Sequence, residues 1–343
     1  MTISFFPVKI EKMDKIYIKE LKDPASQGRE IISCFALRKM ELRTKDSDGK
    51  PFLSLELGDA SGRMDAVLWN EAQAAFSQLA VGDAVAVKAT VGSYRDSPQL
   101  RVENIAKADP SDYSLEHFLP QSSLSPAERE AAIRSELVGI KDPVLAKLLS
   151  LFFDDGDFRQ RFLAAPAAKL WHHAYLGGLA EHTLAVCRLA HAAAANYELL
   201  DHQLLLTGAL LHDIGKIPEF RVTTFIDYSD EGRLLGHIVL GDQMLKERLA
   251  KVRDFPQEKA MRLRHMMLSH HGERERGSPV TPATLEALVL HHCDYLDSHA
   301  GAFTRIIKRE GGSGKRWSDY VNLIDRFIYL PEGNGESEEP RLL

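Results

Sequence analysis

A histidine and an aspartate stand side by side at His212 and Asp213, directly after an apolar run in the segment LLHDIGK (210–216). Imidazole and carboxylate together suit a borderline or hard divalent ion such as Mn, Fe, Co, Zn or Mg. A carboxylate can also bridge two ions, which an imidazole cannot do. The same residues would also form an exposed helix end, with Gly215 after the last turn and Lys216 beside the terminal carbonyls. The dipeptide alone favours this structural interpretation.

The other histidines change that balance, because thirteen of the fourteen lie at or after His172. Apolar residues at helical spacing predict four helices in this region, and each has a histidine or an acid on its apolar face. The helices cover 180–196, 234–249, 256–271 and 283–299, and the inward-facing residues are His182, His237, His270 and Asp294. One such residue is more often a satisfied core group than a ligand. Five elements that all deliver such residues inward indicate a shared metal site.

The order of these residues resembles the HD superfamily of metal-dependent phosphohydrolases in its two-metal form, over residues 169–300. The segment GGLAEHT (177–183) is similar to the first-histidine segment of the branch that includes the YhaM-type exoribonucleases. That branch also carries an N-terminal nucleic-acid-binding domain. The resemblance implies a 3′-to-5′ exoribonuclease that hydrolyses phosphodiester bonds of single-stranded RNA, with single-stranded DNA left open as a further substrate.

The resemblance also implies roles for the residues of the site. One ion would take His182, His212, Asp213 and Asp294, and the other would take Asp213, His237 and His270, so that Asp213 is the bridge. Two ions held in this way would activate a hydroxide for attack on phosphorus. Mn is the expected ion, and Fe, Co, Mg and Zn are alternatives. Asp213 and Lys216 are the expected catalytic residues, since Lys216 follows His212 by one helical turn and can reach a phosphate oxygen.

Other polar residues near the predicted site have less certain roles. His271 lies about 100° round the helix from His270, and it replaces His270 as a ligand if that helix ends early. The candidate substrate contacts are His172, His173, Lys315 and Arg316. For the two histidines a surface or capping role competes with this interpretation. For the glycine-rich segment 311–316 the competing interpretation is a loop, because the segment lacks the phosphate-binding loop pattern.

The first hundred residues have a β pattern, with alternating strands at 31–37, 52–57 and 64–69, a short helix at 71–79, and further strands at 84–94 and 99–105. This order predicts a five-stranded OB barrel, and 52–105 also resembles OB domains of the tRNA-anticodon type. Such barrels stack bases on aromatic rings over a basic track. The expected nucleic-acid contacts are Phe52, Tyr94, Arg63, Lys88, Arg95 and Arg101, whereas Phe35 and Trp69 are expected in the core.

The expected fold class is therefore multidomain α+β, an N-terminal five-stranded OB β-barrel followed by an all-α HD-type hydrolase domain. The predicted parts are the nucleic-acid-binding barrel at 1–112, a helical connector that packs on the HD core at 113–165, the HD domain at 166–330, and a disordered tail at 331–343. Within the HD domain, the polar stretch 221–232 is predicted to be a loop over the site. A last helix is predicted at 320–329.

Composition narrows the class of protein. With 343 residues, 44% hydrophobic and 27% charged, the chain is typical of globular proteins. A net charge of −6 excludes a polycation that binds nucleic acid without discrimination. Three cysteines show no paired zinc spacing, and no apolar run approaches the length of a membrane span. A cytoplasmic protein without membrane partners is expected, with single-stranded RNA as its partner and homo-oligomer formation left open.

Two alternative functions compete with the exoribonuclease prediction. One is a phosphodiesterase or phosphohydrolase acting on a small nucleotide, such as a cyclic dinucleotide or a guanosine polyphosphate. No Gly-Tyr-Pro element follows His271, where GERER stands instead, so the cyclic-di-GMP branch is disfavoured. The other alternative is a non-catalytic RNA-binding adaptor that uses metal only to hold its fold. The full ligand set and Lys216 argue against it.

Overall fold

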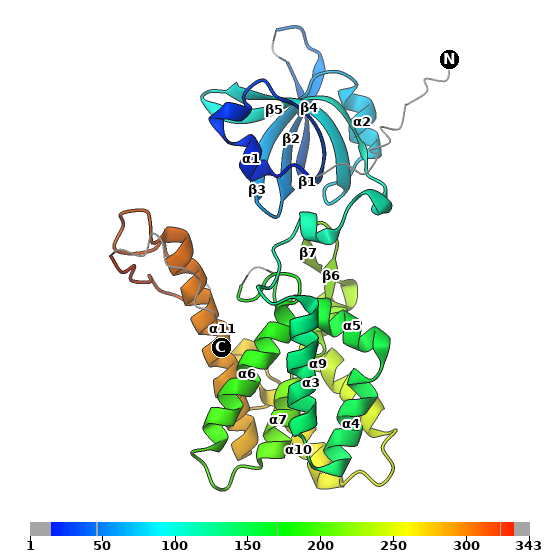
Figure 1. The fold of residues 1–343 in the computed structure, drawn as a ribbon, viewed down its shortest axis with the longest axis vertical. Helices are drawn as coiled ribbons and strands as arrows, with labels where there is room; N and C mark the ends of the chain where they lie inside the picture. Colours follow the sequence, from blue (N-terminus) through cyan, green and yellow to red (C-terminus); the bar gives the residue numbers. More distant parts are fainter. Residues whose placement is uncertain (1–14, 46, 170, 323, 333–343) are drawn as a thin grey trace. The chain divides into compact units, whose positions relative to one another are not determined.

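The computed structural model describes residues 15–332 except 46, 170 and 323 (Figure 1). The chain divides into two compact units, of which the first runs to Gln121 and includes Val222–Asp227, and the second takes Ser122–Arg221 and the residues from Tyr228 onward. Most of the tail predicted to be disordered, 333–343, lies outside the described residues. The domain boundaries at 112 and 165 stay a prediction.

The first unit contains a closed five-stranded barrel in the order β1-β2-β3-β5-β4. Its elements are β1 (Glu30–Thr44), β2 (Pro51–Asp59), β3 (Gly62–Leu68), α2 (Ala72–Gln78), β4 (Ala84–Tyr94) and β5 (Ser97–Lys107), preceded by α1 (Ile18–Leu21). β3 and β5 pair in parallel, and the other neighbouring strands are antiparallel. Three strands, a helix and two strands in a closed barrel form the predicted OB fold.

β1 closes the barrel because it pairs with two strands along its length. Its first half, from Glu30 to Ala36, pairs with β4, and its second half pairs with β2. The register shifts between Leu37 and Lys39, where an irregularity of the β-bulge kind lets the strand bend from one partner to the other. Phe35 is fully buried, as predicted, together with Leu53, Val85 and Leu100.

The second unit is built mainly of helices (Figure 1). Its helices are α3 (Pro126–Gly139), α4 (Pro143–Phe153), α5 (Gly156–Ala164), α6 (Gly178–Ala194), α7 (His202–Leu211), α8 (Lys216–Glu219), α9 (Asp230–Leu249), α10 (Gln257–Ser269) and α11 (Leu285–Glu310). Its main apolar core includes Leu145, Phe152, Leu204, Met266 and Leu290. Among the described residues, no helix combines the length and apolar character that crossing a membrane requires.

Two glycines bring the site-bearing segments together. A Cβ atom on Gly215 would lie 1.9 Å from the His237 carbonyl oxygen, so only glycine permits the start of α8 to approach α9 this closely. Gly236 has a φ of 71°, which interrupts the helical path of α9 immediately before His237. The short α8 and the kinked α9 therefore hold His212, Asp213 and His237 in one place.

Three local predictions for the second half of the chain were wrong. The stretch 221–232 contains β6 (Phe220–Val222), β7 (Ile226–Tyr228) and the start of α9. Its central residues belong to the barrel unit, where the Thr224 hydroxyl donates a hydrogen bond to the Gly82 carbonyl. The helix predicted at 283–299 continues to Glu310.

In the last predicted helix, 320–329, the described residues (all but 323) instead form an irregular hairpin. Trp317 pairs with Tyr329 and Val321 with Arg326, both antiparallel. The prediction failed because Val321, Ile324 and Ile328 recur at helical spacing and all pack on one face. Asp325, with a φ of 53°, turns the chain between the two arms, which a helix does not allow.

Candidate metal centre

Five elements of the helical unit deliver buried polar side chains to one place. His182 lies in the second turn of α6, His212 and Asp213 follow α7, and Asp294 lies on α11. The other two are His237, which follows the kink in α9, and His270, which caps the C-terminal end of α10. His182 and His270 are fully buried, and Asp213 is 2% exposed. The inward faces predicted from helical periodicity are therefore the faces that meet.

Three ligand-type atoms surround His182 Nε2 in a first cluster. His212 Nε2 lies 3.2 Å from it, Asp294 Oδ1 3.2 Å and Asp213 Oδ2 3.4 Å. His212 Nε2 and Asp213 Oδ2 are 3.3 Å apart. Two atoms that ligate one ion at about 2.1 Å are separated by roughly 3 to 3.5 Å. These spacings fit one divalent ion among the four side chains.

A second cluster faces the other carboxylate oxygen of Asp213. His270 Nε2 and His237 Nε2 lie 3.6 and 3.7 Å from Asp213 Oδ1, too far for hydrogen bonds. All three atoms are buried without a hydrogen-bond partner. Since buried polar atoms are nearly always paired, three unpaired ones that face one spot are the arrangement expected of a cation-binding site. Asp213 thus presents one oxygen to each cluster.

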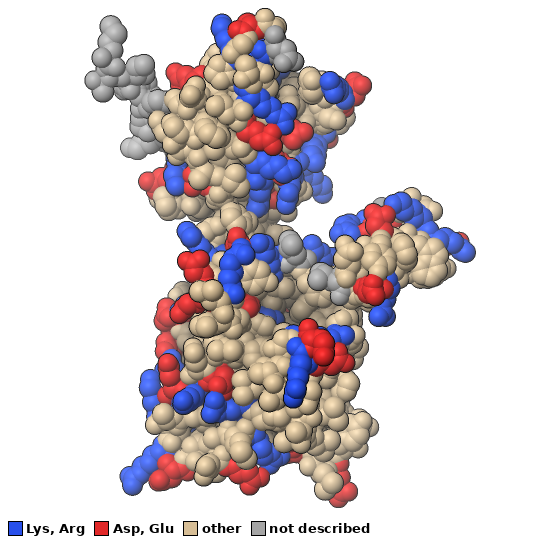
Figure 2. Space-filling view, turned by 180° about the vertical axis from the view of Figure 1, so that it is seen from behind, with Lys and Arg blue, Asp and Glu red and all other residues tan. Residues whose placement is uncertain are grey.

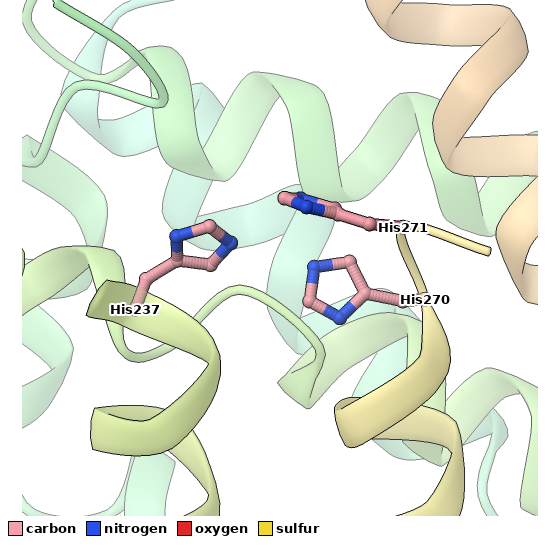
Figure 3. A group of neighbouring side chains, drawn as sticks. All are labelled: His237, His270 and His271. Atoms are coloured by element: carbon pink, nitrogen blue, oxygen red, sulfur yellow. The ribbon is translucent and has the colours of Figure 1, made fainter. Parts of the chain in front are cut away.

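His271 joins the second cluster together with His270. The rings of His237, His270 and His271 lie around a common space (Figure 3), and one nitrogen from each falls within 4.8 Å of the others. α10 ends at Ser269, so the 100° helical separation that made the two histidines alternatives does not apply beyond it. The structure places both residues at the site.

The ring orientation of all five histidines follows one rule. Each places Nδ1 against an oxygen acceptor, which fixes the proton on Nδ1 and leaves Nε2 free as a metal-binding lone pair. The acceptors are Asp297 Oδ2 for His182 (2.7 Å), the Ala209 carbonyl for His212 (2.8 Å), Glu219 Oε1 for His237 (3.0 Å), the Met267 carbonyl for His270 (2.6 Å) and the Arg276 carbonyl for His271 (2.9 Å). Such outer contacts orient ligands at metal sites.

Sequence reasoning missed two of these acceptors, Asp297 and Glu219. Asp297 follows Asp294 by three residues and so shares its face of α11, which was a usable signal. Glu219 ends α8 three residues after Lys216, and it also accepts a hydrogen bond from the His237 backbone N–H at 3.0 Å. No pattern in the sequence pairs Glu219 with His237, because the contact depends on how α8 and α9 pack.

Burial and neighbouring side chains within the centre shift the pKa values of its ionisable residues. Burial alone would raise the pKa of the Asp213 carboxyl, but Lys216 and His212 outweigh it and hold that pKa well below its usual range. Burial lowers the pKa of His270, and burial with the charge of His270 lowers the pKa of His271 to about 3. The ionised carboxylate of Asp213 and the neutral imidazoles of His270 and His271 are the forms that bind metal. Burial by itself would lower the pKa of His182, but the carboxylates of Asp213, Asp294 and Asp297 raise it instead, so this ring gives up a proton when it binds metal.

Lys216 is part of the centre, although it is not a ligand. Its Nζ lies 2.6 Å from Asp213 Oδ2, and its side chain is buried. Burial would lower the pKa of this amine, but Asp213 and Asp294 raise it above its ordinary value. Lys216 therefore remains a cation inside the site.

The two histidines predicted as substrate contacts have different surroundings. His173 Nε2 bonds Asp297 Oδ2 at 3.0 Å and its Nδ1 bonds the Tyr175 hydroxyl at 2.6 Å, so both ring nitrogens are used. His172 has two buried ring nitrogens without a hydrogen-bond partner, and its ring centroid lies 5.2 Å from that of His182. His172 is thus the one of the pair with a nitrogen to offer a substrate.

The cations predicted on the segment after α11 are not at the centre. Lys315 pairs with Asp319 at 3.1 Å, and Arg316 pairs with Glu332. Both lie in the segment that leads into the hairpin at 317–329.

On the barrel, one surface hollow brings together aromatic and basic side chains. Phe52 and Trp69 lie with ring centroids 4.7 Å apart, and Lys45 Nζ sits 5.4 Å from the Trp69 ring centre. Lys39, Arg43, Phe52, Trp69 and Tyr94 line the hollow, together with Glu41, Glu56 and Asp65. The core position expected for Trp69 was wrong, since it is 47% exposed. Met64, Ala66 and Leu68 are the inward residues of β3, so alternation places Trp69 on the outward side, beside Phe52.

The basic residues predicted as nucleic-acid contacts are not among those that line this hollow. Arg63 pairs with Glu56 and Lys88 with Glu103, at 3.1 and 2.6 Å. Arg95 stacks on the Tyr94 ring at 5.3 Å, and Arg101 lies on β5 beside Gly92. Of the six predicted contacts, the two aromatic ones, Phe52 and Tyr94, lie in the hollow.

Comparison with known proteins agrees with both units. Residues 179–299 match the HD domain family, and residues 38–108 match the OB-fold nucleic acid binding domain family. The chain is 32% identical over 310 residues to the 3′-5′ exoribonuclease YhaM of Listeria welshimeri, covering 88% of this chain and 96% of the relative. It is 33% identical over 303 residues to the YhaM of Bacillus subtilis strain 168, covering 88% and 95%.

Proposed function

The chain belongs to the YhaM family of 3′-5′ exoribonucleases, and from this premise we propose that it is a divalent-metal-dependent exoribonuclease that degrades single-stranded RNA from the 3′ end. It is a phosphodiesterase of the HD type. The observation that carries the metal dependence is the orientation of five histidines. Each of the five Nδ1 atoms lies against an oxygen acceptor. Each Nε2 atom either faces an oxygen of Asp213 or lies beside a histidine whose Nε2 does so.

The donor set fits two divalent ions. His182, His212, Asp213 and Asp294 would hold one, and Asp213, His237, His270 and His271 would hold the other. Carboxylates and neutral imidazoles suit Mn, which is the expected ion, and Fe, Co and Zn are alternatives with the same ligand preference. Mg fits less well because it prefers oxygen ligands. When bound, such ions lower the pKa of water and neutralise charge on the phosphate.

The chain's own residues then position the scissile phosphate. Lys216 keeps its ammonium charge next to Asp213, from where it stabilises negative charge that develops on a phosphate oxygen. His172 offers a ring nitrogen beside His182 for a hydrogen bond to the terminal nucleotide. Asp297 and Glu219 orient their histidines and touch no substrate.

The barrel supplies the affinity for a polymer. The Phe52 and Trp69 rings form a platform with Lys39, Arg43 and Lys45 near it, which suits bases stacked along a phosphate chain. Stacking accepts any base, so this surface predicts little sequence preference. It also accepts single-stranded DNA, which is a second substrate to be tested.

The test is incubation of the purified protein with Mn and RNA labelled at its 5′ end. We expect a ladder of labelled products that shortens with time, a block by a 3′-terminal phosphate, and no products in EDTA. Lys216→Met should keep its metal and lose roughly 100-fold in turnover if the ammonium stabilises developing charge. Small nucleotides incubated in parallel test the alternative function, a phosphodiesterase or phosphohydrolase of small nucleotides. Hydrolysis of these nucleotides without hydrolysis of RNA would overturn the exoribonuclease proposal.

A further inference from the structure

Four exposed aromatic side chains gather on the segment that follows α11. Trp317, Tyr320, Phe327 and Tyr329 are between 46% and 56% exposed. Within the described part of the helical unit, only Tyr197 and Tyr228 are other aromatic residues with comparable exposure. Large exposed apolar groups that cluster in this way mark binding surfaces.

The hairpin geometry sets these rings in two pairs. Trp317 lies directly across from Tyr329, with ring centroids 5.5 Å apart, and Tyr320 lies 5.1 Å from Phe327. The backbone N–H of Ser318 donates to the Ile328 carbonyl at 2.9 Å, and both of these side chains are buried. Because side chains alternate along paired strands, the buried residues face α11 and the rings face outward. We call residues 316–330 the aromatic hairpin.

The aromatic hairpin is anchored to the segment that leads into the metal centre. Ile324 and Ile328 pack with Ile306 of α11, and Trp171 packs against the same cluster. Arg305 Nη1 donates to the Trp171 carbonyl at 2.7 Å. Trp171 directly precedes His172, whose ring lies beside His182. α11 carries Asp294 and Asp297 near its middle and Ile306, which supports the hairpin, near its C-terminal end, so the separation along the helix from Asp294 to Ile306 is about 18 Å.

Basic residues accompany the rings. Residues 303–332 contain six Lys or Arg and four Asp or Glu, in a chain whose net charge is −6. Figure 2 shows Lys and Arg along the edges of this segment, with uncharged surface and acidic groups between them. Lys315 and Arg316 are both more than half exposed despite their ion pairs with Asp319 and Glu332. Exposed ion pairs exchange readily for other partners, including phosphates.

We propose that the aromatic hairpin is a second binding surface for single-stranded RNA, which holds the part of the substrate that lies upstream of the nucleotide in the metal centre. This rests on the proposed function. Aromatic rings with interspersed cations are what a single strand requires, since its bases have exposed faces and its backbone is anionic. The path along α11 from the metal centre to the hairpin connects the reacting end of the strand to this surface.

The test compares variants that remove one ring from each pair, Trp317→Leu and Phe327→Leu. Each should lower the affinity for a long single-stranded RNA in EDTA roughly 5- to 100-fold. The affinity for a dinucleotide and the Mn-dependent hydrolysis of bis(p-nitrophenyl) phosphate should not change. Tyr197→Leu removes a ring of similar exposure elsewhere in the same unit and should leave all three measurements unchanged. Thermal unfolding checks that each variant is folded, and RNA carrying photoreactive uridines should cross-link to the peptide that contains Trp317.

Unchanged affinity in both variants, with the wild-type protein still giving the RNA ladder, would overturn the hairpin proposal and leave the proposed function intact. Absence of the ladder in the wild-type protein would instead overturn the function. A second copy of the chain is the other candidate for binding to this surface. Sedimentation of each variant tests it by measuring the oligomeric state. A fall in RNA affinity that appears only with a change in oligomeric state would assign the rings to a contact between copies.

Discussion

Asp213 links the two clusters of the metal centre, since its Oδ2 faces His182 and His212 and its Oδ1 faces His237 and His270. No other described carboxylate contacts both clusters in this way. Its charge is held by Lys216, because burial by itself would favour the protonated acid. The arrangement predicts that the two ion sites depend on one residue.

Asp213→Asn should abolish RNA degradation and lower bound Mn from about two ions to one or fewer, because an amide is a poor bridge between cations. Metal content is measured on protein dialysed against Mn. Asp242→Asn, which alters a partly exposed ion pair with Arg264 on α9 and α10, is the matched control. If Asp213→Asn kept both its metal and its turnover, the two-ion arrangement would be wrong.

Asp297 is a positioning residue for His182, and its replacement tests that role. Asp297→Asn should weaken Mn binding roughly 10- to 100-fold, since the His182 Nδ1–H would lose its anionic acceptor. Turnover should recover when Mn is raised, which a merely misfolded variant would not show. His173→Gln leaves the contact between Asp297 and His182 in place, so it should affect Mn affinity less. Equal Mn affinity in Asp297→Asn and wild type would contradict the role.

At the scale of elements, the site depends on helix ends more than on helix interiors. His212 and His270 occupy the C-terminal caps of α7 and α10, and His237 follows the kink in α9. Buried contacts between helices hold α7, α10 and α11 together. Glu286, at the start of α11, makes two such contacts. Its carboxylate accepts a hydrogen bond at 3.0 Å from the backbone N–H of Asp201, which precedes α7, and forms an ion pair at 2.8 Å with Arg262 of α10.

Glu286→Gln should lower the free energy of unfolding by about 1 to 3 kcal/mol near neutral pH. Burial would raise the pKa of Glu286, but the hydrogen bonds from Arg262 and Asp201 outweigh it and lower that pKa. A carboxyl whose pKa is lower in the folded state stabilises the fold above its ordinary pKa and loses this effect as pH falls through the folded value. Urea unfolding at neutral and acidic pH should show the gap between variant and wild type closing in acid. A constant gap would contradict the ionic origin.

At the scale of the whole molecule, the metal centre and the aromatic platform of the barrel belong to different units. The metal-centre residues all lie in the helical unit, and the platform of Phe52 and Trp69 lies in the barrel unit. Under the proposed function, a small ester needs only the helical unit, whereas a long strand contacts both.

Trp69→Leu should therefore weaken binding of long single-stranded RNA roughly 5- to 100-fold and leave hydrolysis of bis(p-nitrophenyl) phosphate unchanged. Phe76→Leu, an exposed ring on α2 outside the hollow, is the control. RNA affinity of the wild type should fall steeply with salt, because phosphate contacts release counterions. Equal RNA affinity of Trp69→Leu and wild type across the salt series would show that the platform does not contribute to RNA binding.

Much of the fold and of the candidate site could be predicted from the sequence alone. The period of 3.6 residues placed His182, His237, His270 and Asp294 on faces that are buried, since a helix has one apolar side and that side must meet the core. Alternation over short segments, separated by turns, was enough to specify the five-stranded barrel. Periodicity tells which side of an element faces inward, and both results depend on that property.

Only the tertiary structure decided what each inward side meets and where the elements stop. Trp69 packs beside Phe52 on the barrel surface and not in the core, and His270 and His271 share a site because α10 ends before both. The apolar spacing at 321–328 predicted a helix, yet a turn at Asp325 folds it back as a hairpin. Asp297 and Glu219 orient their histidines through contacts between separate helices. Local sequence specifies neither the partner across an interface nor the end of an element, because both are set by packing against residues distant in the chain.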